Sequence, residues 1–231
     1  MARWTPIERT LRALHGPLLV GVDEVGRGPL AGPVVACAIV MPPGRRAIAG
    51  VDDSKKLDAA TRVVLAARIR EQALVVSLGA ASAREIDQIN IYHATVLAMR
   101  RALARVPGRL GCEPNHVLID GKPLRTLGLV HTAVVKGDAK CYAIACASIV
   151  AKVTRDRLMR ALAARHDGYA WERNSGYGTT AHRAALDVRG LTAHHRRSFC
   201  LEAQVAMQLD PIAPDEFDVP LQILYAECVH E

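Results

Sequence analysis

The strongest constraint on how this chain can fold is residues 21–35, GVDEVGRGPLAGPVV, where two adjacent acids separate apolar residues from a glycine-rich turn. The apolar run predicts a buried strand over residues 17–23, and the β-branched run after the turn predicts a second over residues 33–41. Adjacent carboxylates at the end of a buried strand suit a divalent cation, and glycines beside them let a polyanion approach the backbone. The segment therefore indicates metal-assisted chemistry on a phosphate ester.

The rest of the chain shows alternating strands and helices, as judged from periodicity and capping residues. Further strands are expected over residues 73–80, 116–120 and 132–135. Helices are expected over residues 58–71, 82–105, 144–165 and 179–188, and in a segment ending near residue 209. This order predicts an α/β fold in which a mixed five-stranded sheet is flanked by helices and followed by a helical C-terminal region.

The chain has 231 residues, enough for one large domain with a sizeable core. We expect an N-terminal extension over residues 1–16, a catalytic domain with its C-terminal helices over residues 17–209, and an acidic, proline-containing tail over residues 210–231. The first 16 residues lack the apolar stretch of a signal peptide, and no apolar run is long enough to span a membrane. Six cysteines without zinc-ligand spacing favour reduced thiols. We therefore expect a cytoplasmic protein with no membrane partner.

Charge is distributed unevenly along the chain. The formal net charge is +7, from 30 basic and 23 acidic side chains. Six of the acids lie after residue 209, where there is no Lys or Arg, so the body carries 30 basic against 17 acidic groups. A basic body favours polyanionic partners, of which nucleic acid is the commonest. Aromatic residues make up only 4% of the chain, so any base stacking must depend on few rings.

A third acid, Asp120, repeats the pattern of Asp23. It ends a short apolar strand, and Gly121 opens the turn that follows. Because ligand sites in open α/β sheets lie at the carboxyl ends of strands, Asp23, Glu24 and Asp120 are expected to converge there. Any one of these acids alone is more simply a solvated turn residue or a helix cap, but the adjacent pair needs a nearby cation.

A fourth acid, Asp156, lies on the helix expected over residues 144–165. It shares one face of that helix with Ser148 and Lys152, and this polar stripe needs a polar neighbour because small and apolar residues fill the other faces. Taken alone, Asp156 is more simply the ion-pair partner of Lys152 or Arg160. Taken together, four acids favour two-metal phosphodiester cleavage, in which cations about 3.5–4 Å apart activate water and stabilise the leaving 3′ oxygen. The expected cofactor is Mg²⁺ or Mn²⁺.

The glycines at 26 and 28 formally match a dinucleotide-binding fingerprint. That fingerprint requires a helix next, whereas a strand follows here, so no such site is expected. The plainer interpretation is a tight hairpin turn, but Arg27, between the glycines and beside two acids, favours contact with substrate.

Other polar loops are compatible with more than one role. Lys55 and Lys56 lie in a loop before a helix. They could equally be solvated residues that cap this helix or residues that contact a phosphate. The basic loop at residues 136–140 has the same two possible roles. Tyr177 is flanked by glycines, so its ring is either part of the core or exposed for stacking on a sugar or base. The basic cluster at residues 194–197 is expected to be solvated surface.

Together these stretches resemble type 2 ribonuclease H, specifically the bacterial ribonuclease HII family. The resemblance implies a ribonuclease H-like fold and endonucleolytic cleavage of RNA in RNA–DNA hybrids. It also implies incision 5′ to single ribonucleotides embedded in duplex DNA, which leaves 3′-hydroxyl and 5′-phosphate ends. The matching segments are GVDEVGRGPLAGPVVACAIV (21–40), DSKKL (53–57), HVLIDG (116–121), KGDAKCYAIACASIVAKVTRDRLM (136–159), GYGTTAH (176–182) and HHRRSF (194–199).

The resemblance also implies roles for individual residues. The metal-binding catalytic acids would be Asp23, Glu24, Asp120 and Asp156. The ribose 2′-hydroxyl would be recognised by Gly26, Arg27 and Gly28, the deoxyribose at the RNA–DNA junction by Tyr177, and phosphates by Lys55 or Lys56. The expected partners are RNA–DNA hybrid and ribonucleotide-containing duplex DNA, bound by a monomer.

Some features depart from the family pattern. Val25 stands where the family usually has Ala, and the segment after Tyr177 lacks an expected lysine and glutamate. Ribonuclease HIII would carry an extra N-terminal domain, for which 16 residues leave no room. Gln222 does not begin a sliding-clamp peptide.

Two alternatives can be compared with this interpretation. A 3′–5′ exonuclease of the same fold would separate its first two acids by one residue, and a non-catalytic nucleic-acid binder would not need four acids.

Overall fold

A mixed five-stranded sheet forms the centre of the computed structural model, which describes residues 4–200. The strand order is β3-β2-β1-β4-β5; β1 pairs antiparallel with β2 and parallel with β4, and this confirms the predicted sheet. The remaining pairs are antiparallel for β2–β3 and parallel for β4–β5. The strands are β1 (Leu19–Val25), β2 (Val34–Val40), β3 (Val75–Ala81), β4 (His116–Asp120) and β5 (His131–Val134).

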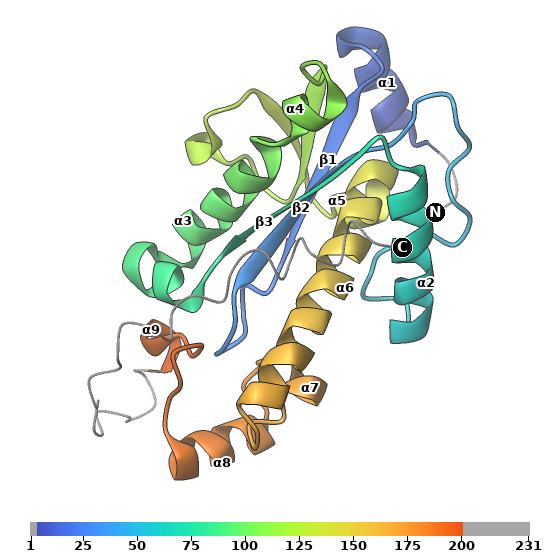
Figure 1. The fold of residues 1–231 in the computed structure, drawn as a ribbon. Coiled ribbons are helices and arrows are strands. Elements are labelled where there is room, and N and C mark those ends of the chain that lie inside the picture. Colours follow the sequence, from blue (N-terminus) through green and yellow to red (C-terminus); the bar gives the residue numbers. More distant parts are fainter. Residues whose placement is uncertain (1–3, 201–231) are drawn as a thin grey trace.

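Helices cover both faces of the sheet (Figure 1). One face carries α3, and the other carries α6 with α2 packed beyond it. Asp58 is the N-cap of α2, where its carboxylate accepts the Thr61 N–H at 2.8 Å. The long helices match the predicted ones to within three residues at each end: α2 (Ala59–Gln72), α3 (Ala83–Leu103), α6 (Tyr142–Arg165) and α8 (Thr180–Arg189).

Six shorter elements were not predicted, because most of them are too short to show a helical period. They are α1 (Pro6–His15), α4 (Val106–Leu110), η1 (Arg125–Leu127), α5 (Gly137–Lys140), α7 (Trp171–Asn174) and α9 (Arg197–Cys200). The segment expected to end near residue 209, the acidic tail and Gln222 lie outside the described residues. The domain boundaries at residues 16 and 209 stay predictions. Within residues 4–200, no helix is long and apolar enough to cross a membrane.

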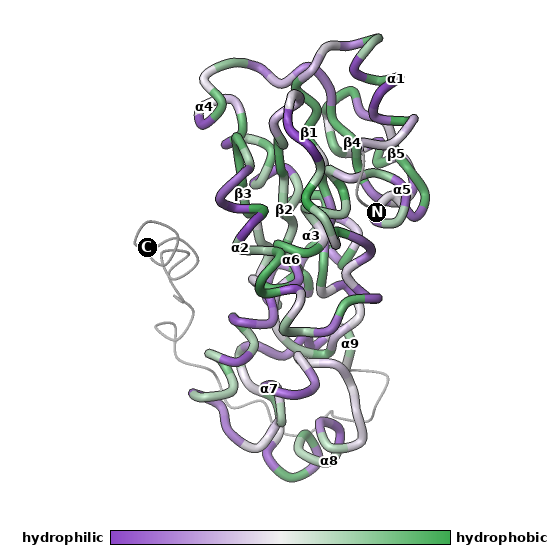
Figure 2. The backbone as a smooth tube through the Cα atoms, turned by 90° about the vertical axis from the view of Figure 1, so that its right-hand side faces the viewer, coloured by the Kyte–Doolittle hydropathy of each residue, from purple (hydrophilic) through white to green (hydrophobic). Residues whose placement is uncertain are grey.

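The central strand β2 is buried on both faces. All seven of its side chains are fully buried, as expected for a strand with helices on either side. Alternate residues join the two core layers: the layer under α3 takes Val34, Ala36, Ala38 and Val40, and the layer under α6 and α2 takes Val35, Cys37 and Ile39. In Figure 2 the hydrophobic colour accordingly concentrates along the central strands and α6.

The C-terminal helices α7 and α8 lie beyond one end of the sheet, at the end of α6 (Figures 1 and 2). This confirms the predicted helical C-terminal region. A separate small core joins them to the body, where Ala31 after β1 packs with Met159 of α6 and Trp171 of α7. The turn after β1 and the C-terminal helices therefore form one packed unit.

Close contact between α6 and β1 sets the position of the candidate site. A Cβ at Gly21 would lie 2.3 Å from the carbonyl carbon of Ala143, so only glycine allows this approach. Farther along, Gly26 after β1 meets the side chain of Arg155. Helix α6 thus runs beside β1 toward the acids and past them.

The buried carboxylate of Glu8 fixes the start of α6. It is fully buried and accepts the N–H groups of Tyr142 at 3.1 Å and Ala143 at 2.8 Å. The same carboxylate closes a capping box with Thr5 at the start of α1. One negative charge therefore satisfies unpaired N–H groups of two helices and favours the positive end of α6.

We predict that Glu8→Ala lowers the free energy of unfolding by about 3 kcal/mol, because two buried N–H groups lose their acceptor. Urea denaturation followed by circular dichroism measures this. Asp58→Ala is the matched control, since it removes an exposed carboxylate cap from α2, and its loss should be clearly smaller. Equal losses in the two variants would contradict the role of Glu8.

Candidate active site

Asp23 and Asp120 lie side by side on neighbouring strands. In the parallel register of β1 and β4, Val22 pairs with Ile119, so the next residues are Asp23 and Asp120. Asp23 is only 5% exposed, and its pKa is raised well above its ordinary range by burial and by the charges of Glu24 and Asp120. Burial also raises the pKa of Asp120, and burial together with the charge of Asp120 raises that of Glu24. Burial and mutual repulsion thus act together on three neighbouring acids.

Asp23 and Glu24 lie inside β1 rather than at its end. The strand continues to Val25, two residues beyond its predicted end, because Glu24 pairs with Ala36 of β2. Successive strand residues point to opposite faces. Their surroundings differ accordingly: the Ser148 hydroxyl of α6 interacts with Asp23, and Arg27 pairs with Glu24 at 3.3 Å.

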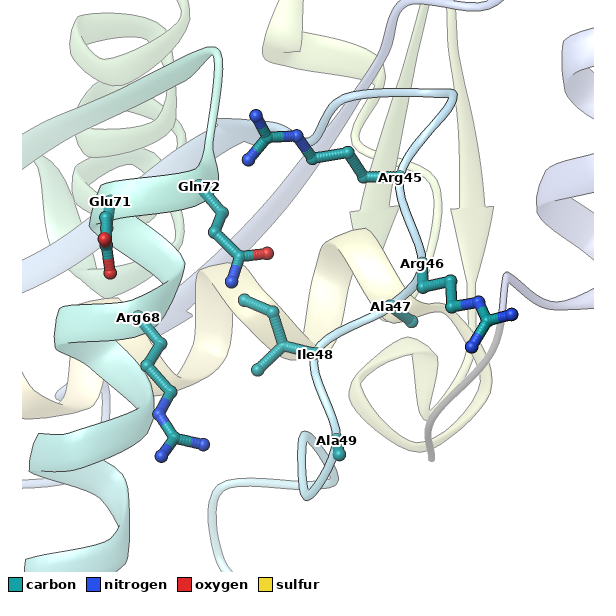
Figure 3. Close-up of a pocket in the computed structure, with 8 residues that line it drawn as sticks. All are labelled: Arg45, Arg46, Ala47, Ile48, Ala49, Arg68, Glu71 and Gln72. Carbon is teal, nitrogen blue, oxygen red and sulfur yellow. The ribbon is translucent and has the colours of Figure 1, made fainter.

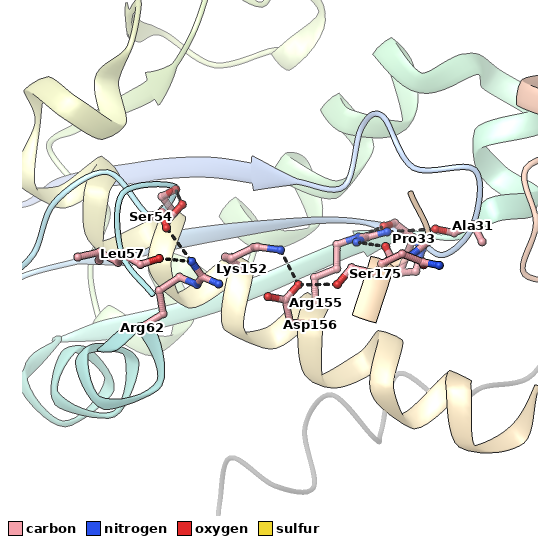
Figure 4. A network of polar contacts seen from close by, with 12 residues as sticks. Ala31, Pro33, Ser54, Leu57, Arg62, Lys152, Arg155, Asp156 and Ser175 are labelled. Carbon is pink, nitrogen blue, oxygen red and sulfur yellow. Dashed lines mark hydrogen bonds and ion pairs between the residues drawn. The ribbon is translucent and has the colours of Figure 1, made fainter. Parts of the chain in front are cut away.

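Asp156 lies farther along α6, beside the loop that leads to Tyr177. Its carboxylate pairs with Lys152 at 2.7 Å and accepts the Ser175 hydroxyl at 3.3 Å (Figure 4). The Ser148 hydroxyl lies 2.9 Å from that of Ser54, so the polar stripe of α6 does have the polar neighbours that the sequence required. The ion pair with Lys152 was the plainer interpretation, and it is compatible with a ligand role as well.

The two lysines of the 53–57 loop differ in their surroundings. Lys55 pairs at 3.3 Å with the buried carboxylate of Asp138, whereas Lys56 pairs with Asp52, on its own loop. Asp138 contributes to the raised pKa of Asp120 and so lies near the strand acids. Lys55 is therefore the lysine that faces them.

Asp138 lies beside the candidate site, and the sequence analysis did not single it out. It lies in α5, inside the loop that was considered only for its lysines. Its neighbour Gly137 donates its N–H to Asp120 at 2.5 Å. The sequence pattern that could have pointed to Asp138 is an acid between two small residues, Gly137 and Ala139, shortly after the last strand.

The donor set fits a hard divalent cation. Carboxylate oxygens are the ligands that Mg²⁺ and Mn²⁺ prefer, and a cation bound here would offset the burial and the mutual repulsion that raise the pKa values of Asp23, Glu24 and Asp120. Among residues 4–200, however, no three His, Cys, Asp or Glu side chains form a group that could hold a metal ion. Shared ligation of ions by all four acids therefore stays a prediction.

The turn at residues 26–28 lies against Tyr177. Gly26 has φ 92° and is buried, whereas Arg27 and Gly28 are exposed. A Cβ at Gly28 would lie 3.7 Å from Cε1 of Tyr177, whose side chain is 46% exposed. The structure thus brings the predicted sugar-contacting residues together, although they are about 150 positions apart in the sequence.

The expectation that residues 194–197 form solvated surface is wrong for two of them. His195 is 2% exposed and Arg196 is fully buried. His195 packs against the rings of Tyr169 and Trp171, and Arg196 lies beneath the 26–28 turn. Local sequence could not show this, because the residues that cover Arg196 lie far away along the chain.

A chain of hydrogen bonds connects His195 to Tyr177. Trp171 Nε1 donates to His182 Nε2 at 3.1 Å, and His182 Nδ1 lies 2.9 Å from the Tyr177 carbonyl, so His182 carries its proton on Nδ1. His195 accepts the Thr192 N–H on Nδ1, and its Nε2 lies 3.0 Å from His182 Nε2. Both imidazoles are neutral in this arrangement. Burial, reinforced by the neighbouring histidines, lowers the pKa of His195 to about 3.

This histidine cluster predicts loss of stability in acid. Burial lowers the pKa values of His182, His194 and His195 below the ordinary 6.5, so below that pH the unfolded chain binds protons that the folded chain does not. The free energy of unfolding should fall as pH drops from about 6.5, by up to ~1.4 kcal/mol per pH unit for each histidine.

Urea denaturation between pH about 7.5 and 5 tests this expectation. His195→Gln should show a shallower pH dependence than the unmodified protein, whereas His93→Gln, which replaces an exposed histidine of α3, should not. The same slope in all three proteins would show that the cluster does not titrate as expected.

A separate hollow of about 510 Å³ lies between the loop after β2 and the second half of α2 (Figure 3). The Ile48 N–H in this hollow donates to the Tyr142 hydroxyl at the start of α6. Asp156 is 14 residues farther along α6, roughly 21 Å away. The side chains of Arg45, Arg46 and Arg68 point in different directions (Figure 3), so the hollow is not a convergent anion site. None of the residues that line it is a candidate site residue.

Comparisons with known proteins identify a family that the chain matches over most of its length. The family model described as Ribonuclease HII matches residues 20–202. The chain is 55% identical over 193 residues to a ribonuclease HII of Gluconobacter oxydans, covering 82% of this chain and 91% of that protein.

Solved structures show the same fold. The ribonuclease H2 of Pyrococcus horikoshii OT3 superposes with a TM-score of 0.64 at 25% identity, covering 78% of this chain and 93% of that one. Bst-RNase HIII in complex with Mn²⁺ has a TM-score of 0.64 at 19% identity, covering 84% and 70% of the two chains.

Proposed function

The chain belongs to the ribonuclease HII family and is an endoribonuclease that acts on RNA–DNA hybrids, and we propose that it also incises 5′ to single ribonucleotides embedded in duplex DNA. One observation carries this proposal: the 26–28 turn and the Tyr177 ring lie together beside the acids. Arg27 of the turn pairs with Glu24, and Ser175, two residues before Tyr177, donates to Asp156. A sugar held between the turn and the ring would place its phosphate next to the carboxylates. Family membership removes the exonuclease alternative.

We assign metal binding to the four acids Asp23, Glu24, Asp120 and Asp156. Two Mg²⁺ or Mn²⁺ ions would supply an activated hydroxide and stabilise the leaving 3′ oxygen, which gives 3′-hydroxyl and 5′-phosphate ends. The protein's own contribution is electrostatic. Burial holds the acids in a region of low dielectric, where they attract cations strongly.

The surrounding residues bind and orient the substrate. Lys55 is exposed beside Asp138, where its ammonium can contact a phosphate next to the metal ions. None of the N–H groups of Gly26, Arg27 and Gly28 donates to another residue within 4–200, and Arg27 and Gly28 are exposed, so the turn can offer unpaired N–H groups to the ribose 2′-hydroxyl. The half-exposed Tyr177 ring is placed to pack on the next sugar. The basic body attracts the nucleic acid as a whole, and we infer that the protein works in the cytoplasm as a monomer.

We predict that Asp120→Asn reduces cleavage on the order of 10³-fold with Mg²⁺ or Mn²⁺, because it removes a charged ligand. Asparagine keeps an oxygen that can accept the Gly137 N–H, so the melting temperature should not fall. Glu113→Gln is the control, since it removes an exposed carboxylate from the loop before β4, at the opposite end of that strand. Full activity of Asp120→Asn would refute the assignment.

We predict that the unmodified protein cuts a DNA duplex containing one ribonucleotide, on the 5′ side of that nucleotide. An end-labelled duplex resolved on a denaturing gel identifies the bond that is broken. The same duplex with a deoxyribonucleotide at that position should remain intact. Cleavage confined to continuous RNA tracts would leave the general activity standing but would refute the single-ribonucleotide proposal.

A further inference from the structure

Two arginines are fully buried at the base of the 26–28 turn. Arg155 comes from α6 and Arg196 from the segment after α8, and both are 0% exposed. Neither forms an ion pair with a carboxylate within residues 4–200. Their donors go instead to six main-chain carbonyls: Arg155 to those of Ala31, Pro33 and Ser175 (Figure 4), and Arg196 to those of Gly26, Arg27 and Gly32.

Such an arrangement has a large desolvation cost and therefore contributes little net stability to the fold. Burying a guanidinium without a directly paired carboxylate is unfavourable, and burial lowers the pKa values of both Arg155 and Arg196, although the charges of Asp156 and Asp87 act in the opposite direction. What the hydrogen bonds provide is fixed geometry, because a planar fork of donors holds several carbonyls at defined angles. The carbonyls that are held belong to the turn predicted to read the ribose.

Arg196 determines which backbone groups the turn can present. Its Nη1 donates to the Arg27 carbonyl at 2.8 Å, and its Nη2 donates to the Gly26 carbonyl. With these two oxygens facing the protein interior, the N–H groups of the turn are the ones left for a ligand. The positive φ of Gly26 and its contact with Arg155 allow no side chain there.

The same segment also connects the turn to the Tyr177 loop. The Arg196 N–H donates to the Leu30 carbonyl at 2.8 Å, and the Leu30 N–H donates to the Gly176 carbonyl at 2.8 Å. Residue 30 therefore joins the chain before Tyr177 to the chain at Arg196. A change at Arg196 should alter how a sugar is held without altering the acids.

We propose that Arg196 is a positioning residue for ribose discrimination: it holds the carbonyls of Gly26 and Arg27 so that the N–H groups of the turn stay directed at the 2′-hydroxyl. This rests on the proposed function, in which that turn reads the ribose. Arg196 touches neither the substrate nor the acids in this scheme.

The test measures binding rather than cleavage. In an Asp120→Asn background, which blocks cutting, the dissociation constant is measured for a duplex with one ribonucleotide and for the all-DNA duplex of the same sequence. Arg196→Gln should reduce the ratio of these constants about fivefold, the effect of losing one or two hydrogen bonds. Affinity for the all-DNA duplex should stay within about twofold, because backbone phosphate contacts dominate it.

Two further variants make the result decisive. Arg100→Gln is the matched control, because Arg100 also donates to main-chain carbonyls, those of Thr126 and Leu127, which belong to neither the 26–28 turn nor the Tyr177 loop, and the ratio should not change. Arg196→Lys keeps the charge but not the fork, so its ratio should also fall; it decides the question if Arg196→Gln does not fold, as judged by circular dichroism. An unchanged ratio in folded Arg196 variants overturns the role of Arg196 alone. A background protein that shows no preference for the ribonucleotide overturns the proposed function and this inference together.

Discussion

The direct contact between α6 and β1 is the constraint on which the rest of the structure depends. Gly21 lets the helix backbone approach the strand, and Glu8 fixes where the helix begins. From that fixed start, helix α6 places Ser148 next to Asp23. Two turns later, it places Asp156 next to the loop before Tyr177. Spacing along a single helix thus sets the distance between the strand acids and the loop that carries Tyr177, the proposed sugar-contacting residue.

Most of the charged side chains of the candidate site form ion pairs. Three cationic side chains reach the acidic region from three different segments, and each pairs with one acid: Arg27 with Glu24, Lys55 with Asp138 and Lys152 with Asp156. Asp23 and Asp120 form no such ion pair among the described residues and carry raised pKa values. The charges of Glu24, Asp138 and Asp156 are thus neutralised by side chains of the protein itself. A divalent cation would be bound most favourably next to the two acids that have no such partner, Asp23 and Asp120.

Sequence was sufficient for features that depend on local pattern. Strands with apolar runs, long helices and acids near strand ends could all be recognised, since each is encoded within a few residues. It failed where burial is decided by distant segments: Asp138 seemed part of a basic loop, and Arg196 seemed exposed. The end of β1 was also misplaced, because pairing between Glu24 and Ala36 extends the strand past the charged residues. Cross-strand pairing and long-range hydrogen bonds leave no periodic signal.

The contact between Arg196 and Gly26 spans 170 positions of the chain. A polypeptide emerging from the ribosome presents all four acids long before it presents the arginine that closes the turn. The two halves of the site thus become complete at different times during synthesis. A nascent chain that stops short of residue 196 would contain every acid and yet lack the support of the turn, so the order of translation separates the proposed metal ligands from the residue proposed to position the ribose-reading turn.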